Sequence, residues 1–292
     1  MSVLALLAAA LFPTQIRVPF PQAMRVAIAG GQVFAPSANG RGAVVSGGRI
    51  VKTFEAGENP VSIAVMGGDL VIAHHERKYV TVHHAPSFAP QQIAVDVTPH
   101  THFAAVGDLD GDGKPDIAVN DMGGKRVVVL WGPDFSQTTA APTGSKGYAY
   151  ENVSVVGQRL YVPCWPQPEV AVLKARGREI ARERLIELSN PAFFVAGDKA
   201  VVTYSGSISD NSRDGLVLLD SGKVLDAGRA PVRVAALNGL VATAALGGTV
   251  KAGDFTVEVP HPEDVALGDL DGDGKPDLAI AAGDEIILFM TR

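Results

Sequence analysis

The sequence predicts an all-β protein, a seven-bladed β-propeller built from four-stranded antiparallel blades. Three observations lead to this prediction. Short apolar runs are separated by turn residues along all 292 positions, and Gly (32) and Pro (19) are abundant. The decapeptide GDLDGDGKPD occurs twice, starting at Gly107 and at Gly268. Finally, an apolar run, a turn and a second apolar run recur at the spacing of a repeated supersecondary unit.

The repeat length follows from the two acidic segments, which start 161 residues apart, or four units of roughly 40 residues. Each copy lies between two apolar runs, and the same pattern without acids occurs five more times. The turn positions are Gly30, Gly67, Gly107, Gly157, Gly197, Asn238 and Gly268, spaced by 37, 40, 50, 40, 41 and 30 residues. Glycine or asparagine is what a tight hairpin with positive φ requires at these positions.

The outer strands are predicted from the runs that follow each hairpin. Two further β-like runs follow most hairpins, as at 79–82 and 92–95, which makes four strands per unit. The third unit has only a weak outer run near Thr138. The segment 176–189 is ambiguous because its apolar residues fall at helical spacing. We favour an outer strand there, since the repeat requires one, and keep a short helix as the alternative.

The last unit lacks a fourth strand, because the chain stops at Arg292 soon after the run near Ile286. The segment Gln15–Phe20 precedes the first unit and has no unit of its own to join. We predict that it supplies the outer strand of the last blade and closes the ring. Closure removes the exposed sheet edges that could pair with other chains.

Composition limits the function classes. The net charge is −6 and no basic cluster occurs, which argues against nucleic-acid binding. The single cysteine, Cys164, excludes an intramolecular disulfide and is predicted to be a small buried apolar side chain. Nothing in the sequence marks an oligomer interface, so we expect a monomer.

The N-terminal run Val3–Phe12 contains ten apolar residues, too few to span a bilayer but typical of a signal-peptide core. Met1 and Ser2 lack the usual basic charge, and a buried first strand is the alternative. We predict a signal peptide at 1–12, one propeller domain at 13–292, a secreted or periplasmic location, and no membrane insertion.

The acidic segments carry the clearest chemistry. Four carboxylates in nine residues repel one another unless a cation lies among them, and calcium prefers six to eight oxygens in an irregular cage. Position 7 of each loop is a lysine, which offers only its backbone carbonyl. The predicted ligands for two Ca²⁺ ions are Asp108, Asp110, Asp112, Lys114 and Asp116, and Asp269, Asp271, Asp273, Lys275 and Asp277.

An EF-hand is the main alternative for such a loop. It needs glutamate at position 12 and flanking helices. Position 12 is Val119 in the first copy and Ile280 in the second, and each lies in an apolar run typical of a strand. The sequence therefore predicts calcium loops between strands, and their role is expected to be structural.

The pattern DxDGDGxxD between two strands resembles the FG-GAP/VCBS repeats of integrin α-subunit propellers and of many bacterial secreted proteins. The resemblance is specific at 103–121 and 264–282 and only architectural elsewhere. The Phe-Gly and Gly-Ala-Pro elements are absent, and five of the seven units lack the acids. The family implies a calcium loop between the two innermost strands of a blade. Its members include adhesion modules, lectins and polysaccharide-active enzymes, so it implies no single activity.

A ligand face is predicted on the side of the ring opposite to the acidic hairpins. Loops expected on that side carry five of the seven histidines. The candidate ligand-binding residues are His74, His75, His100, His102, Trp165, His261 and Glu263. They could form a transition-metal or acid–base site, or they could be ordinary polar loop residues. Trp165 could stack on a sugar or pack between blades.

The sequence thus favours a secreted, calcium-binding propeller that recognises a protein or glycan without catalysis, and no catalytic residue is assigned. No nucleophile elbow, phosphate-binding glycine loop or HExxH motif occurs in the chain. The alternative is a propeller enzyme acting on carbohydrate, similar to a polysaccharide lyase, with a histidine-lined site on the face opposite the calcium loops.

Overall fold

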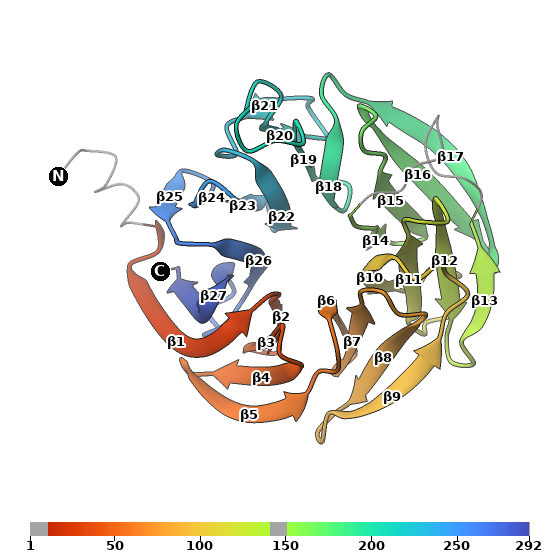
Figure 1. Cartoon of the computed structure of the whole chain (residues 1–292), viewed down its shortest axis with the longest axis horizontal. Coiled ribbons are helices and arrows are strands. Elements are labelled where there is room, and N and C mark those ends of the chain that lie inside the picture. Colours follow the sequence, from red (N-terminus) through yellow and green to blue (C-terminus); the bar gives the residue numbers. More distant parts are fainter. Residues whose placement is uncertain (1–10, 141–150, 292) are drawn as a thin grey trace.

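The computed structural model describes residues 11–140 and 151–291, which form seven sheets arranged in a ring (Figure 1). In six of the sheets the four strands pair in sequence order, and the first strand of each lies nearest the centre of the ring. The predicted fold class, a seven-bladed propeller of four-stranded antiparallel blades, is confirmed.

The blades follow one another along the chain. Blades one to three consist of β2 (Ala27–Ala29), β3 (Gln32–Pro36), β4 (Arg41–Ser46), β5 (Arg49–Glu55), β6 (Pro60–Met66), β7 (Asp69–His74), β8 (Tyr79–His84), β9 (Ala89–Ala94), β10 (Thr101–Gly107), β11 (Asp116–Asp121), β12 (Arg126–Trp131) and β13 (Ser136–Thr139). Blades four to six consist of β14 (Ser154–Val156), β15 (Arg159–Pro163), β16 (Glu169–Arg176), β17 (Glu179–Glu187), β18 (Ala192–Ala196), β19 (Ala200–Thr203), β20 (Gly215–Leu218), β21 (Val224–Leu225), β22 (Pro231–Leu237), β23 (Leu240–Ala245), β24 (Thr249–Ala252) and β25 (Phe255–Glu258).

Blade seven joins the two ends of the chain. It contains β26 (Pro262–Gly268), β27 (Asp277–Met290) and β1 (Thr14–Ala23). The long β27 turns at Gly283, whose φ is +59°. The part before this turn pairs with β26, and the part after it pairs with β1 in the register Val18 to Ile286. The prediction that an N-terminal segment closes the ring is confirmed.

Two uncertain segments are settled by the strand assignments. The segment 176–189 contains the outer strand β17, so the helical alternative is wrong. The weak run near Thr138 forms the outer strand β13. The signal-peptide prediction falls mostly on residues 1–10, which lie outside the described residues. In the described part of the chain, no helix is long and apolar enough to cross a membrane.

The ring has two faces, which we name by their loops. The hairpin face carries the turns between the first and second strands of each blade. The opposite face carries the loops that lead into each first strand and those between second and third strands. Positive φ angles occur at five of the predicted turn positions, Gly30, Gly67, Gly157, Gly197 and Asn238.

Gly107 and Gly268 are glycine for a different reason than predicted, because both end the strands β10 and β26 without a positive φ. A Cβ atom at Gly107 would lie 2.4 Å from Cγ1 of Val155, and one at Gly268 would lie 2.3 Å from Cγ2 of Ile28. In both cases the contact is with the first strand of the following blade. These glycines therefore allow close packing between neighbouring blades.

The core lies in the seams between adjacent sheets. The seam between blades three and four contains the fully buried Leu109, Leu160 and Leu173 beside Trp131, which is only 1% exposed. Cys164 is buried in the same seam, as predicted, and burial raises the pKa of its thiol to about 12. Apolar burial at such seams stabilises the ring by about 25 cal/mol per Å².

Blade two also contains a buried polar chain of histidines. His74 and His83 are both fully buried, and their Nε2 atoms each lie 2.8 Å from Oγ1 of Thr81. The other ring nitrogen of His74 contacts the Glu58 carbonyl at 2.7 Å, and that of His83 contacts the Phe88 carbonyl at 3.3 Å. Burial lowers the pKa of His74 and lowers that of His83 to about 4.

Replacing Val18 with Asp tests ring closure. Val18 is 4% exposed and packs in the seam between blades seven and one. We expect the free energy of unfolding in urea to fall by about 3 kcal/mol, because the variant buries an unpaired carboxylate beside the closing strand pair. The control is Gln15→Asp, at an exposed position of the same strand. Equal losses of unfolding free energy in the two variants would show that ring closure does not depend on packing in this seam.

The depressed pKa of His83 predicts a loss of stability in acid. In the unfolded chain this histidine takes up a proton near pH 6.5, whereas in the folded chain it does so only near pH 4. Its contribution is therefore complete above pH 6.5 and declines as the pH falls toward 4, by about 3 kcal/mol at most. Urea titrations across this range should show a smaller loss in His83→Gln than in the wild type, while His261→Gln behaves as wild type. Parallel curves for all three proteins would contradict this assignment.

Candidate functional site

The two acidic loops have the same internal hydrogen bonds. In the first loop, Asp108 accepts from the backbone N–H groups of Gly111 and Gly113 at 2.7 and 3.0 Å. In the second loop, Asp269 makes the equivalent bonds at 2.7 and 3.0 Å. The glycines that allow this curl have φ between +82° and +84°. The two loops, which start 161 residues apart in the sequence, therefore form the same turn. Within each loop, this turn brings the carboxylates close to one another.

The ninth position of each loop fixes the turn to the rest of its blade. Asp116 and Asp277 are fully buried. Asp116 accepts from the backbone N–H groups of Leu109 and Gly132, both at 2.8 Å. Asp277 accepts from Leu270 at 2.7 Å and from both the N–H and the hydroxyl of Thr291. One carboxylate thus joins the first hairpin of the blade to the end of its third strand.

The carboxylates of each loop are close enough to share a cation. One oxygen from each of Asp108, Asp110 and Asp116 lies within 4.8 Å of the others, and so does one from each of Asp269, Asp271 and Asp273. Burial raises the pKa of Asp116, and the charge of Asp110 adds to this effect. Clustered carboxylate oxygens are ligands that suit a hard divalent cation such as calcium.

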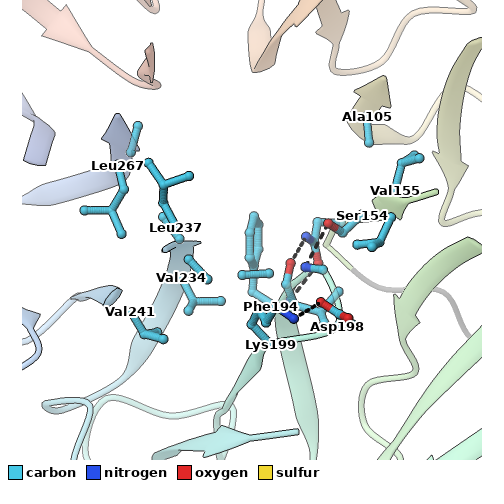
Figure 2. A pocket seen from close by; sticks show the side chains of 18 of the residues that line it. Ala105, Ser154, Val155, Phe194, Asp198, Lys199, Val234, Leu237, Val241 and Leu267 are labelled. Atoms are coloured by element: carbon cyan, nitrogen blue, oxygen red, sulfur yellow. Dashed lines mark hydrogen bonds and ion pairs between the residues drawn. The ribbon is translucent and has the colours of Figure 1, made fainter. Parts of the chain in front are cut away.

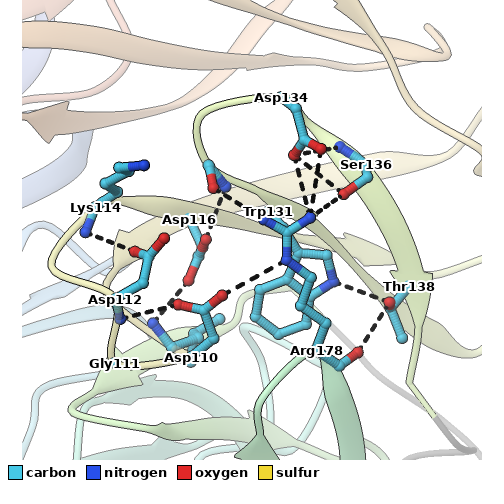
Figure 3. A network of polar contacts seen from close by, with 12 residues as sticks. Asp110, Gly111, Asp112, Lys114, Asp116, Trp131, Asp134, Ser136, Thr138 and Arg178 are labelled. Atoms are coloured by element: carbon cyan, nitrogen blue, oxygen red, sulfur yellow. Dashed lines mark hydrogen bonds and ion pairs between the residues drawn. The ribbon is translucent and has the colours of Figure 1, made fainter.

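Protein cations lie beside both loops. Nε of Arg178 is 3.6 Å from a carboxylate oxygen of Asp110, and its Nη1 also contacts Asp134 and Ser136 (Figure 3). Arg178 lies in the turn between β16 and β17, so it connects blade four to the loop of blade three. In the second loop, Nζ of Lys275 is 3.2 Å from Asp273. These ion pairs offset part of the repulsion between the aspartates.

On the opposite face, three of the predicted histidines come together. His75 follows β7, whereas His100 and His102 lie at the start of β10 in the next blade. One ring nitrogen from each lies within 4.8 Å of the others. The rings of His100 and His102 are stacked with centroids 4.8 Å apart, and the ring of His75 meets each at 5.0 Å.

The remaining predicted residues lie elsewhere. His74 is in the buried chain of blade two and points away from its neighbour His75, since successive residues of a strand alternate in direction. Trp165 is half-buried, and its indole N–H donates to the Tyr204 carbonyl at 3.4 Å. His261 lines a separate groove beside Gly283. The carbonyl of Glu263 accepts from Arg25 at 3.4 Å.

A largely buried charged cluster on the opposite face was missed from the sequence. It contains Arg25, Glu151, Arg233 and Asp264, one from each of four blades. Burial, aided by the charge of Arg233, lowers the pKa of Arg25 to about 10. Burial raises the pKa of Asp264 despite both arginines. For Glu151 the contact with His102 and the arginine charges outweigh burial, and its pKa is lowered.

Irregularities in the inner strands position this cluster. The register of β22 shifts between Pro231 and Arg233, and that of β26 shifts between Pro262 and Asp264. Such bulges redirect the side chains that follow them. The signal available in the sequence was a proline two residues before a charged residue in two loops that lead into first strands.

The central channel contains an apolar cavity of about 710 Å³ (Figure 2). It extends from Phe103 and Phe194, whose rings meet edge to face at 5.3 Å, to the hairpin turns of blades four to six. The guanidinium of Arg233 lies 4.9 Å from the Phe194 ring centroid. The charged cluster therefore adjoins the aromatic end of the cavity, whereas hairpin residues such as Asp198, Lys199 and Asn238 line its other end.

Comparison with known proteins supports the architecture. Two segments, 102–130 and 261–286, match the FG-GAP repeat family. They correspond to the acidic hairpins of blades three and seven and the strands beside them. A comparison with curated protein sequences found no match.

Solved structures share the fold at low sequence identity. A catalytically inactive variant of virginiamycin B lyase from Staphylococcus aureus with quinupristin is 12% identical, with a TM-score of 0.72, covering 96% of this chain and 99% of that one. The WD40 propeller of Doa1 is 12% identical with a TM-score of 0.67, covering 97% of both chains. The Pan2 WD40 domain from Neurospora crassa is 8% identical with a TM-score of 0.65, covering 93% and 90%. The chain is thus a seven-bladed β-propeller that carries FG-GAP repeats in blades three and seven.

Proposed function

We propose that the protein is an exported recognition module whose propeller is stabilised by two calcium ions. The observation that carries the proposal is the pair of acidic loops with identical internal hydrogen bonds. The calcium ligands are Asp108, Asp110, Asp112, Asp116 and the Lys114 carbonyl in blade three, and Asp269, Asp271, Asp273, Asp277 and the Lys275 carbonyl in blade seven. Their role is to hold the hairpins, not to act on a substrate.

Calcium suits these loops better than magnesium does. Magnesium requires nearly octahedral geometry and retains several waters, whereas calcium accepts an irregular set of carboxylates and carbonyls. Each loop brings four negative charges, and one calcium ion neutralises two of them. We therefore expect affinities of about 10⁻⁴ to 10⁻³ M, as in extracellular modules. Such sites fill reliably where calcium is abundant, which supports export.

Calcium in blade seven also bears on ring closure. Asp277 begins β27 and bonds Thr291, the residue that follows its end. The last part of β27 pairs with β1. An ion bound to Asp277 therefore fixes both ends of the strand that closes the ring. Blade three has no such role, although its loop has the same chemistry.

The recognition surface we propose is the apolar cavity on the hairpin face. Val, Leu, Ala and Phe side chains dominate its lining, and Asp198, Lys199 and Asp220 are among its few charged residues. Its volume of about 710 Å³ is in the range of ligand sites. An apolar lining with few polar groups favours a protein or peptide ligand that inserts apolar side chains over a glycan.

Calcium addition tests the structural part of the proposal. At about 10 mM calcium each site should add roughly 1.4 to 2.7 kcal/mol, which corresponds to a melting temperature several degrees above that in chelator. Asp112→Ala and Asp273→Ala should each remove part of this increase. Asp254→Ala, an exposed aspartate in a turn of blade six, should retain all of it. Identical melting curves with calcium and with chelator would refute calcium binding.

A peptide array probed with the calcium-loaded protein tests recognition. Ala266→Trp places a large side chain in the cavity lining, and we expect it to lose at least tenfold in binding to the peptides selected by the wild type. A glycan array run in parallel separates the two ligand classes. Undiminished peptide binding by the variant, or an absence of hits on the peptide array, would contradict recognition at this cavity.

A further inference from the structure

We propose that His75, His100 and His102 bind a divalent transition-metal ion of the zinc type. One ring nitrogen from each already lies within 4.8 Å of the other two. Zinc–nitrogen bonds of 2.0–2.1 Å in a tetrahedral site place the ligand nitrogens about 3.3 Å apart. The three imidazoles therefore need to approach one another by about 1.5 Å or less to bind such an ion.

The loop that bears His100 and His102 is rigidly held. The carboxylate of Asp121, fully buried, accepts from the backbone N–H groups of Thr98 and Gly124 and is paired with Arg126. The side-chain oxygen of Asn120 accepts from the backbone N–H of His102 at 3.1 Å and from that of Phe103 at 2.6 Å. Buried side chains of β11 thus fix the loop on both sides of the histidines.

His75 is presented by blade two and held against the same loop. Its backbone N–H donates to the Asn59 carbonyl at 3.0 Å. Two residues later, the carbonyl of Arg77 accepts from the hydroxyl of Thr101, which stands between the other two histidines in sequence. The three imidazoles therefore converge because two neighbouring blades are joined at this point.

Glu151 of blade four supplies a carboxylate that orients one of the three histidines for metal binding. Its Oε2 lies 3.5 Å from Nδ1 of His102. The residue has a φ of +53°, a conformation uncommon for residues with a side chain, and its side chain is 16% exposed. Metal-bound histidines usually donate their second ring N–H to such a carboxylate, which orients the ring and raises its basicity. Glu151 is thus a positioning residue, and Nε2 of His102 is the metal ligand.

The donor chemistry separates this site from the acidic loops. Three neutral imidazoles suit zinc, copper or nickel, whereas the carboxylate loops on the hairpin face suit calcium. Three protein ligands also leave one position of a tetrahedral site for water or another donor. Glu76 and Glu151 contribute negative charge near His100, which offsets the charge of a bound cation.

Calorimetric titration with zinc chloride in excess calcium tests the proposal. We expect one zinc ion per chain, and loss of this binding in the double variant His100→Ala, His102→Ala. Glu151→Gln should retain the ion but bind it about 10- to 100-fold more weakly. His84→Ala, which removes an exposed histidine elsewhere in blade two, should bind like the wild type. Thermal melting of each apo variant establishes that it is folded.

The visible spectrum of bound cobalt(II) distinguishes an imidazole site from a carboxylate site. Tetrahedral imidazole coordination should give intense visible absorption in the wild type and none in the double histidine variant. The double variant Asp112→Ala, Asp273→Ala should keep both the spectrum and the zinc stoichiometry. Loss of zinc in that variant, retention of zinc in the histidine variant, or no zinc binding by the wild type would each overturn the proposal. None of these outcomes depends on whether calcium stabilises the fold.

Discussion

The structure depends on the pairing of β1 with the end of β27, two segments from opposite ends of the described chain. Each blade is a small twisted sheet that buries its apolar faces only against its neighbours, so an open ring would leave two blades half exposed. Val18 and Ile286 meet in this pair and are buried in the seam between blades seven and one. Because Asp277 begins β27 and bonds Thr291 just after its end, the acidic loop of blade seven is built into the closure.

The lining inside the ring changes from charged to apolar beside Phe194. The rings of Phe103 and Phe194 meet edge to face, and Arg233 lies against the Phe194 ring. On one side of this pair two arginines and two carboxylates lie together and are largely buried. Their desolvation is offset by mutual attraction and by backbone hydrogen bonds, such as that from Nε of Arg25 to the Val61 carbonyl at 2.7 Å. Toward the hairpins the lining is mostly apolar.

The strands and their order could be predicted because short apolar runs and turn glycines are local signals, and closure followed from a missing strand in the last unit. What depends on side chains from several blades could not be predicted. His74 and His75 are adjacent in sequence, but only His75 joins the cluster, because strand alternation sends His74 into a buried chain with Thr81. The cavity depends on the summed sizes of inner-strand residues around the ring. The need for glycine at position 107 is explained by Val155 of the next blade, which leaves no room for a Cβ atom there.

The strand β11 connects two of the three proposed metal sites, the acidic loop of blade three and the histidine site. Asp116 at its start belongs to the acidic loop, while Asn120 and Asp121 at its end hold the histidine loop. All six of its residues are buried, and it pairs on both sides within its sheet. At about 3.4 Å per residue it spans the blade between the faces. A buried strand paired on both sides has one arrangement, so it sets the position of the histidines without acting as a switch.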